Sequence, residues 1–155
     1  MKYDEFAVRV EQIRTRLFKT AMLYLGEEQP ALDAVGDAIY KALKGVWRLR
    51  DPALFNTWIT RIVINECYSE LRRRKETPSS EISETTAEQF DSLPLKEAIH
   101  RLPKDLQDVV ILRYFSGYTV AETAEILKIP QGTAATRQRK ALSLLRLDLT
   151  EEVEK

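Results

Sequence analysis

Apolar residues recur at steps of three and four positions along the chain, which is the spacing typical of amphipathic helices. Near the N-terminus the recurring positions are Phe6, Val10, Ile13, Leu17, Ala21 and Tyr24. They predict a helix over roughly residues 3–25 that ends at Gly26. A second stripe, from Ala31 to Val46, predicts a helix over roughly residues 30–46. No alternating pattern of the kind found in strands is present, so the expected fold class is all-α.

A third helix is predicted to begin where Asp51 precedes Pro52, because aspartate caps helices well and proline fits the first helical position. Its apolar stripe consists of Phe55, Trp58, Ile59, Ile62 and Val63. The stripe continues into a basic run at residues 72–75. Phe55 and Trp58 have two interpretations: packing in the core, which we favour, and stacking on unpaired bases.

Residues 76–93 differ in character from the segments on either side. They contain Pro78, several Ser, Thr and Glu residues, and few apolar positions for a core. We interpret them as an acidic, flexible linker with a short helical stretch near residues 87–90. The expected organisation is therefore a helical domain over residues 1–75, the linker over 76–93, and a second helical domain over 94–155.

The second domain has the pattern of a helix-turn-helix. Helices are predicted over roughly residues 95–101, 104–115, 119–128 and 131–147. Thr119 and Glu122 have the spacing of a capping box, in which each side chain binds the other residue's backbone amide. A tight break at residues 129–132 then joins two helices, and the second of these is basic.

The last predicted helix has two distinct faces. Its inner face is expected to carry Ala134, Ala141, Leu142, Leu145 and Leu149. Its outer face carries Thr133, Thr136, Arg137 and Lys140, which are the candidate contacts to duplex DNA. Arginine can bind a guanine edge through two hydrogen bonds, and threonine can bind bases or phosphates. The alternative is a surface helix whose basic residues are simply solvated.

Charge is distributed unevenly, although 24 basic and 24 acidic side chains give a formal net charge of zero. Residues 1–75 hold 14 basic and 10 acidic side chains, and residues 76–93 hold five acidic and no basic ones. Within residues 131–146 there are four basic side chains and no acidic one. Two basic faces separated by an acidic spacer indicate nucleic-acid contacts that the total charge conceals.

Several classes of function are not expected. One cysteine (Cys67) and one histidine (His100) make neither an intrachain disulfide nor a structural zinc site, and we expect no metal or cofactor. Cys67 is expected on the packed side of its helix, and His100 at the surface. We find no nucleophile–base pair and no glycine-rich phosphate loop, so an enzyme is not expected. The absence of an apolar run of about 18 residues and of a secretory signal points to a cytoplasmic protein without membrane insertion.

Three sets of segments, taken in their order along the chain, match the pattern of one protein family. The first set is Phe55-Asn56-Thr57-Trp58-Ile59-Thr60-Arg61-Ile62-Val63-Ile64-Asn65, followed by Leu71-Arg72-Arg73. The second set is Leu102-Pro103-Lys104-Asp105-Leu106-Gln107 and Leu112-Arg113-Tyr114-Phe115, and the third is residues 121–127 and 129–137. Together they resemble bacterial RNA polymerase sigma factors of the extracytoplasmic-function group: the first set is similar to a segment of their first domain, the second to the start of their second domain, and the third to its helix-turn-helix.

The resemblance implies a transcription initiation factor that binds core RNA polymerase and directs it to promoter DNA. The first domain would hold the melted minus-ten strand through Arg48, Arg50, Arg61, Asn65 and Arg72. It would bind polymerase through Asp33 and Asp37, although Leu32 and Gly36 stand where the family has glutamate and glutamine.

The second domain would read the minus-thirty-five element through Thr133, Thr136, Arg137 and Lys140. Ala135 stands where the family has lysine, which removes one phosphate contact. An anti-sigma factor, often tethered to the membrane in this family, is an implied partner. Two other functions stay open at this point: a stand-alone helix-turn-helix regulator, and a helical adaptor with no role on DNA.

Overall fold

The computed structural model describes the backbone of residues 1–76 and 93–154, with side chains for residues 1–76 and 94–147. The chain forms two compact units, one on each side of the undescribed residues 77–92. The described residues contain helices and turns and no strand, which confirms the all-α expectation. The linker and the short helix near residues 87–90 lie outside the described residues, apart from Glu76 and Leu93 at its ends.

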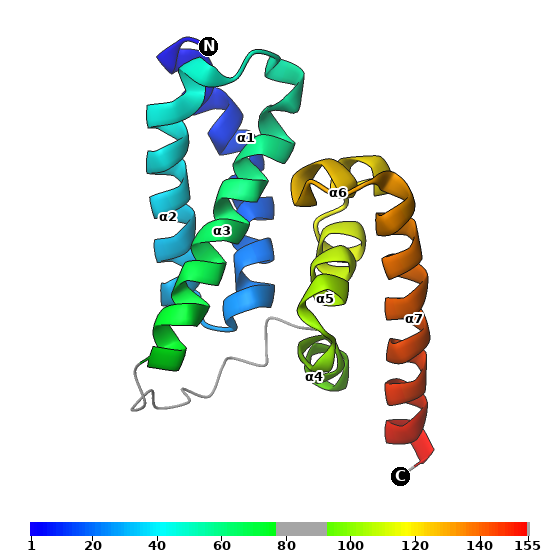
Figure 1. Cartoon of the computed structure of the whole chain (residues 1–155). Coiled ribbons are helices and arrows are strands. Elements are labelled where there is room, and N and C mark those ends of the chain that lie inside the picture. The colour runs from blue at the N-terminus through cyan, green and yellow to red at the C-terminus, as the bar shows by residue number, and fades with distance from the viewer. Residues whose placement is uncertain (77–92, 155) are drawn as a thin grey trace. The chain divides into compact units, whose positions relative to one another are not determined.

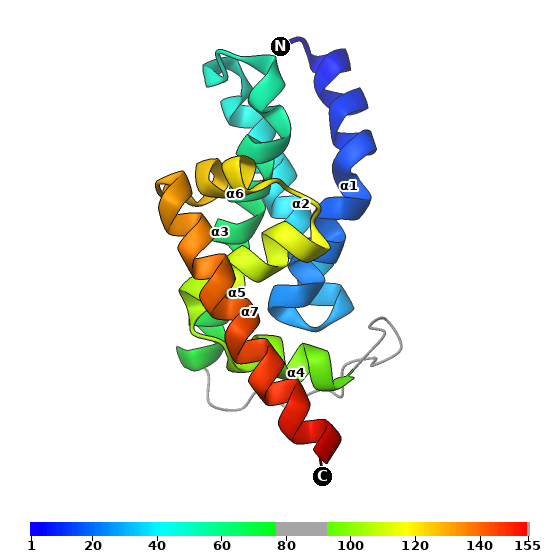
Figure 2. The same ribbon diagram turned by 90° about the vertical axis from the view of Figure 1, so that its right-hand side faces the viewer.

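The first unit is a bundle of three long helices: α1 (Tyr3–Leu25), α2 (Glu28–Gly45) and α3 (Phe55–Glu76). Each of the three packs against the other two, and they run side by side in both views (Figures 1 and 2). Two short 3₁₀ turns, η1 (Val46–Arg48) and η2 (Pro52–Leu54), form the connection between α2 and α3.

The core of the first unit follows the sequence pattern closely. The predicted stripe of α1 is buried, and the helix ends at Gly26, whose φ of 76° is the left-handed conformation that glycine adopts without strain. The carboxylate of Asp51 accepts a hydrogen bond from the Ala53 amide at 3.0 Å, as its capping position predicts. The turn that it caps is 3₁₀, however, and α3 itself begins at Phe55.

The second unit contains α4 (Leu93–Arg101), α5 (Lys104–Val110), α6 (Val120–Leu127) and α7 (Gln131–Glu154). The long helix α7 packs against the other three and extends along α4 and α5 (Figures 1 and 2). It runs further than the predicted end near residue 147.

The helix predicted over residues 104–115 changes type part-way along. After α5 comes a π-helical turn, η4 (Ile111–Phe115), in which the Ser116 amide donates to the Ile111 carbonyl at 2.9 Å. The run from Val109 to Leu112 is buried throughout. The apolar spacing predicted one continuous α-helix over these residues and gave no sign of the wider turn.

The helix-turn-helix is held by local hydrogen bonds. Both bonds of the capping box are present, with Thr119 Oγ1 accepting from the Glu122 amide at 3.1 Å and Glu122 Oε1 accepting from the Thr119 amide at 2.9 Å. Lys128 then ends α6 in a left-handed conformation with φ 56°. The break predicted at residues 129–132 is therefore present, and α7 begins at Gln131.

The inner face of α7 is confirmed in part. Ala134, Ala141 and Leu145 are buried, and the small alanines allow the neighbouring helices to pack closely. The expectation for Leu142 was wrong, because its side chain is 41% exposed. Successive residues of an α-helix are rotated by about 100° around its axis, so Leu142, which follows the buried Ala141, lies off the buried stripe. The side chain of Leu149 lies outside the described part.

Among the described residues, no helix combines the length and the apolarity needed to cross a membrane.

Candidate nucleic-acid and polymerase interfaces

The four candidate contacts to duplex DNA lie together in one groove of the second unit. Its volume is about 400 Å³, and it is lined by Asp105, Leu106, Gly132, Thr133, Thr136, Arg137 and Lys140. Thr136 and Lys140 are exposed, and Thr133 and Arg137 are half-buried. The spacing along α7 therefore produces a single polar surface, as the sequence predicts.

Two of these residues make contacts within the unit. Thr136 Oγ1 lies 3.3 Å from an Arg139 guanidinium nitrogen. Arg137 Nε lies 3.6 Å from Asp105 Oδ2, which pairs the central cation of the groove with a carboxylate from α5. This partner was not anticipated, because the two residues are far apart in the sequence.

The connection between α2 and α3 carries exposed cations and an exposed aromatic ring. Arg48 and Arg50 are exposed, as the predicted contact to a melted strand requires. The guanidinium of Arg48 lies over the ring of Trp47, 5.0 Å from its centroid, and Trp47 is 73% exposed. One turn earlier, Lys44 lies over the ring of Tyr40 at 4.4 Å.

Three further candidates for the melted strand lie on α3. Arg61 is half-buried, whereas Asn65 and Arg72 are exposed. An Arg72 guanidinium nitrogen donates to Ser69 Oγ at 3.2 Å, and Ser69 in turn donates to the Asn65 carbonyl at 3.1 Å. Their spacing along α3 places Arg61, Asn65 and Arg72 on one face of the helix.

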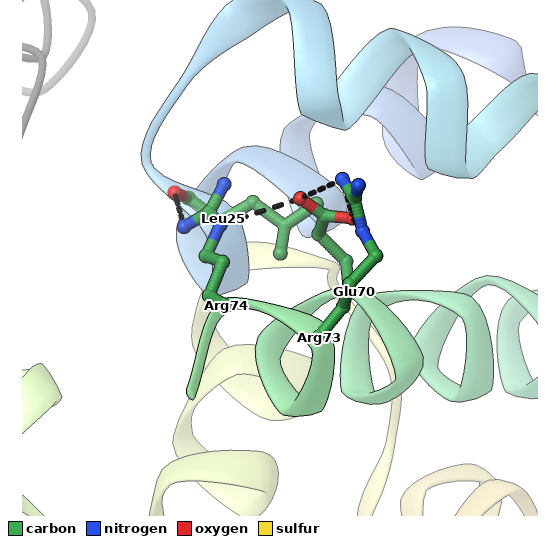
Figure 3. A network of polar contacts seen from close by, with 4 residues as sticks. All are labelled: Leu25, Glu70, Arg73 and Arg74. Carbon is green, nitrogen blue, oxygen red and sulfur yellow. Dashed lines mark hydrogen bonds and ion pairs between the residues drawn. The ribbon is translucent and has the colours of Figure 1, made fainter. Parts of the chain in front are cut away.

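The basic run at the end of α3 is divided between two roles (Figure 3). Arg73 binds the Glu70 carboxylate through contacts of 2.7–3.0 Å. Arg74 lies 3.4 Å from the same carboxylate and donates to the Leu25 carbonyl at 3.0 Å. Helix α1 has no basic residue in its last turn, so Arg74 supplies the cation that stabilises its C-terminal end. Arg72 and Lys75, the other two residues of the run, are both exposed, and Arg72 binds Ser69 rather than Glu70.

The two candidate polymerase contacts lie in a second groove, between α2 and α3. This groove has a volume of about 440 Å³ and is lined by Gln29, Pro30, Asp33, Ala34, Asp37, Glu66, Ser69, Glu70 and Arg73. Asp33 and Asp37 are exposed, and Asp33 Oδ1 accepts a hydrogen bond from the side-chain amide Nε2 of Gln29 at 3.0 Å. The groove adds two carboxylates from α3, Glu66 and Glu70, to the two from α2.

One ion pair connects the two helices that line this acidic groove. Lys41 on α2 donates to Glu66 on α3, and this hydrogen bond raises the pKa of the Lys41 ammonium above its usual value. The pair joins two helices, so Glu66 keeps its place at the edge of the groove.

The aromatic residues of α3 separate into core and surface. Phe55 is fully buried and meets Phe6 edge-on at 5.8 Å, which confirms the core interpretation. Trp58 is half-buried, with its ring 6.0 Å from that of Phe55 and its edge near Gly45. It packs on the core with one side only.

Neither Cys67 nor His100 takes part in these surfaces. Cys67 is buried, and desolvation raises the pKa of its thiol to about 12, so the thiol stays protonated at neutral pH. His100 is exposed in the last turn of α4, as expected. Within residues 1–76 and the described part of the second unit, no group of three or more potential ligands is placed to hold a metal.

Comparison with known proteins agrees with this division into two units. A family model described as Sigma-70 region 2 matches residues 9–77, and one described as Sigma-70, region 4 matches residues 92–148. The RNA polymerase sigma factor SigV of Bacillus subtilis is 30% identical over 87% of this chain and 85% of its own length. The extracytoplasmic-function (ECF) RNA polymerase sigma factor SigM of Mycobacterium tuberculosis is also 30% identical, over 84% of this chain and 69% of its own length. The chain belongs to the extracytoplasmic-function sigma factors.

Solved structures show the same fold. The sigma factor RpoE of Bartonella quintana, in complex with the anti-sigma factor NepR, has a TM-score of 0.77 at 23% identity and covers 94% of this chain and 97% of its own. CnrH, in complex with the cytosolic domain of CnrY, has the same TM-score at 19% identity, over 97% of this chain and 90% of its own. Sigma factors are non-enzymatic, and this sigma factor is an initiation factor that binds core RNA polymerase and directs it to promoter DNA.

Sequence reasoning missed three features of the surfaces. Tyr40 and Trp47 were not among the candidates, although their interleaving with Lys44 and Arg48 is visible in the sequence and is typical of strand-binding surfaces. Asp105 was missed because no local pattern links it to Arg137. Glu66 and Glu70 were missed because their groove forms only when α3 packs against α2.

Proposed function

We propose that the two units of this sigma factor divide promoter recognition between them. The second unit reads the duplex minus-thirty-five element, and the first binds polymerase and the melted minus-ten strand. The observation that carries the proposal is the groove beside α7, where Thr133, Thr136, Arg137 and Lys140 share one surface of a helix-turn-helix. In such motifs the second helix enters the major groove and its N-terminal residues meet the base edges.

In the second unit, the chemistry of these residues fits base and phosphate contacts. Arg137 can donate two hydrogen bonds to the O6 and N7 atoms of guanine. Thr133 and Thr136 offer hydroxyl groups near the start of the helix, and Lys140 lies one turn further on, where a phosphate contact is expected. The exposed basic residues Arg139 and Arg146 on α7 add to the positive charge that attracts DNA.

In the first unit, the connection between α2 and α3 offers both cations and a stacking surface. Arg48 and Arg50 would follow the phosphate backbone of the unpaired strand, together with Arg61, Asn65 and Arg72 on α3. Trp47 would stack on a base through the ring face that Arg48 does not cover. Stacking on aromatic rings together with basic residues is how proteins hold single strands.

The acidic groove between α2 and α3 fits a basic surface of the core polymerase. Asp33 and Asp37 form one wall, and Glu66 and Glu70 the other, with Arg73 already bound to Glu70. Charge complementarity of this kind speeds association and selects the partner. Exposed Leu32 beside Asp33 adds an apolar contact where the family has a glutamate.

Regulation by an anti-sigma factor extends the proposal. One structural neighbour, the sigma factor RpoE of Bartonella quintana, was solved with the anti-sigma factor NepR. A partner that covers the acidic groove or the groove beside α7 would prevent this sigma factor from acting. We place its action in the cytoplasm, where polymerase works, and assign it no catalytic reaction of its own.

The test is transcription by a reconstituted polymerase. The full chain is mixed with core RNA polymerase and a library of promoter fragments, and the RNA 5′ ends are mapped. We expect a distinct set of start sites that core polymerase alone does not use. Duplex binding by the chain without polymerase should be weak at physiological salt.

Two other results would contradict the proposal. Tight, sequence-specific binding to duplex DNA without polymerase would indicate a stand-alone regulator. No association with polymerase and no choice of start site would indicate a helical adaptor.

Trp47 provides a test of the melted-strand surface. Because its ring is exposed, Trp47→Ala should fold normally, and the loss of one stacked base should weaken binding of the unpaired minus-ten strand by about 1 kcal/mol, roughly fivefold. The measurement is the affinity of the reconstituted polymerase for a promoter fragment held open by mismatches. Trp47→Phe keeps a ring and serves as the control, with most of the affinity expected to remain. Unchanged affinity in Trp47→Ala would remove this residue from the interface.

A further inference from the structure

One carboxylate lines the basic groove beside α7. Asp105 comes from the first turn of α5, yet it lines the same groove as Thr133, Thr136, Arg137 and Lys140. Near DNA a negative charge repels the phosphates, so a surface built only for affinity would not place one there. The role of this residue therefore needs a reason other than attraction to DNA.

The contacts of Asp105 hold it toward Arg137. Its Oδ1 atom accepts a hydrogen bond from the Leu106 amide at 3.0 Å, and its Oδ2 atom lies 3.6 Å from Arg137 Nε. The Asp105 side chain is 53% exposed and the Arg137 side chain is 32% exposed. An ion pair this exposed adds little to the stability of a protein, so stability does not explain the arrangement.

The contact with Asp105 does not involve the two terminal nitrogens of the Arg137 guanidinium. Asp105 meets the Nε side of the guanidinium, and the edge formed by the two terminal nitrogens is still able to bind guanine O6 and N7 together. A carboxylate on one side of an arginine also reduces the number of rotamers that the long side chain visits, which lowers the entropy lost on binding.

We propose that Asp105 is a positioning residue that sets the specificity of the minus-thirty-five contact. It orients Arg137 toward a base and discourages Arg137 from binding phosphates at unrelated sequences. The inference rests on the proposed function of the groove and adds a residue from outside the helix-turn-helix to it. Specificity is a difference between two affinities, and a repulsive charge raises it by weakening the wrong complexes.

A double-mutant cycle on the reconstituted polymerase tests this role. The variants Asp105→Asn, Arg137→Ala and the double variant are compared by transcription from promoters with each base at every minus-thirty-five position. Arg137→Ala identifies the position that Arg137 reads. We expect Asp105→Asn to relax the base preference at that same position by roughly two- to fivefold, the size of an exposed ion pair. The affinity of the polymerase that carries Asp105→Asn for unrelated duplex DNA should rise by a similar factor.

The coupling between the two residues is the decisive quantity. In the Arg137→Ala background, Asp105→Asn should change the base preference by less than about twofold, because there is no arginine left to orient. An equal effect in both backgrounds would overturn the proposal and indicate that Asp105 meets a base itself, as an acceptor for cytosine. An unchanged preference in Asp105→Asn would also overturn it.

Controls separate this inference from folding and from the proposed function. Glu97→Gln removes one exposed carboxylate from α4, outside the groove, and should leave both preference and non-specific binding unchanged. Thermal unfolding should be nearly the same for Asp105→Asn and the wild type. If the wild-type chain gives no start-site choice, the proposed function fails. If the wild-type chain does direct start-site choice and Asp105→Asn shows the same base preference as the wild type, the proposed function stands and only the role of Asp105 fails.

Discussion

Replacing Phe55 by alanine is expected to lower the free energy of unfolding of the first unit by about 3–5 kcal/mol, the usual cost of removing a buried aromatic ring. Phe55 is fully buried where α3 begins, and three neighbours surround its ring. Phe6 from α1 meets it edge-on, Trp58 lies tilted beside it, and the Arg9 guanidinium lies 5.5 Å from its centroid. The variant would lose these contacts together and leave a cavity between α1 and α3.

A loss of this size is a large part of the stability of a domain this small, which is typically about 5–15 kcal/mol. Both tryptophans of the chain, Trp47 and Trp58, lie in the first unit, so tryptophan fluorescence during urea unfolding reports on that unit alone. Tyr3→Ala is the matched control, because Tyr3 is an aromatic residue of α1 with an exposed side chain, and it should cost less than about 0.5 kcal/mol. A loss below about 1 kcal/mol in Phe55→Ala would contradict the core assignment.

Arg137→Ala is expected to have the largest effect on promoter choice. If Arg137 donates two hydrogen bonds to a guanine, the variant should lose about 1–3 kcal/mol of discrimination at one position of the minus-thirty-five element. The measurement is transcription from a promoter library, scored as the base preference at each position. Promoters that lack the preferred base should be nearly unaffected.

A different result would assign Arg137 to the DNA backbone. A phosphate contact would weaken every promoter to the same extent and lower the salt dependence of binding by about one charge. Arg139→Ala is a suitable comparison on the same helix, because Arg139 is an exposed cation outside the groove. A uniform effect is the result expected of Arg139→Ala.

Features that depend on residues close together in the sequence were predictable from the sequence alone. The positions of the helices follow from the apolar spacing, and the Thr119–Glu122 capping box and the Asp51 cap formed as their spacing predicted. The outer face of α7 was predictable for the same reason: residues three and four apart lie together on any helix. The candidate DNA contacts in the second unit therefore needed no tertiary information.

Features that depend on packing between helices were not predictable. Nothing in the order of residues shows that Arg74 binds the Leu25 carbonyl, that the ring of Trp47 is exposed, or that Glu66 and Glu70 complete an acidic groove with Asp33 and Asp37. The π-helical turn at Ile111–Phe115 was not predicted from the apolar spacing either. The exposure of Leu142 is different, because it follows from helical periodicity: Leu142 lies about 100° around α7 from the buried Ala141.

Local hydrogen bonding and helical periodicity act over a few residues, so the amino-acid order alone was enough for the all-α fold and for the face of α7 proposed to meet DNA. The amino-acid order alone did not show that Asp105 is the partner of Arg137 on that face. Asp105 lies beside Arg137 because α5 packs against α7, and contacts between segments distant in the chain depend on how a whole core fills space.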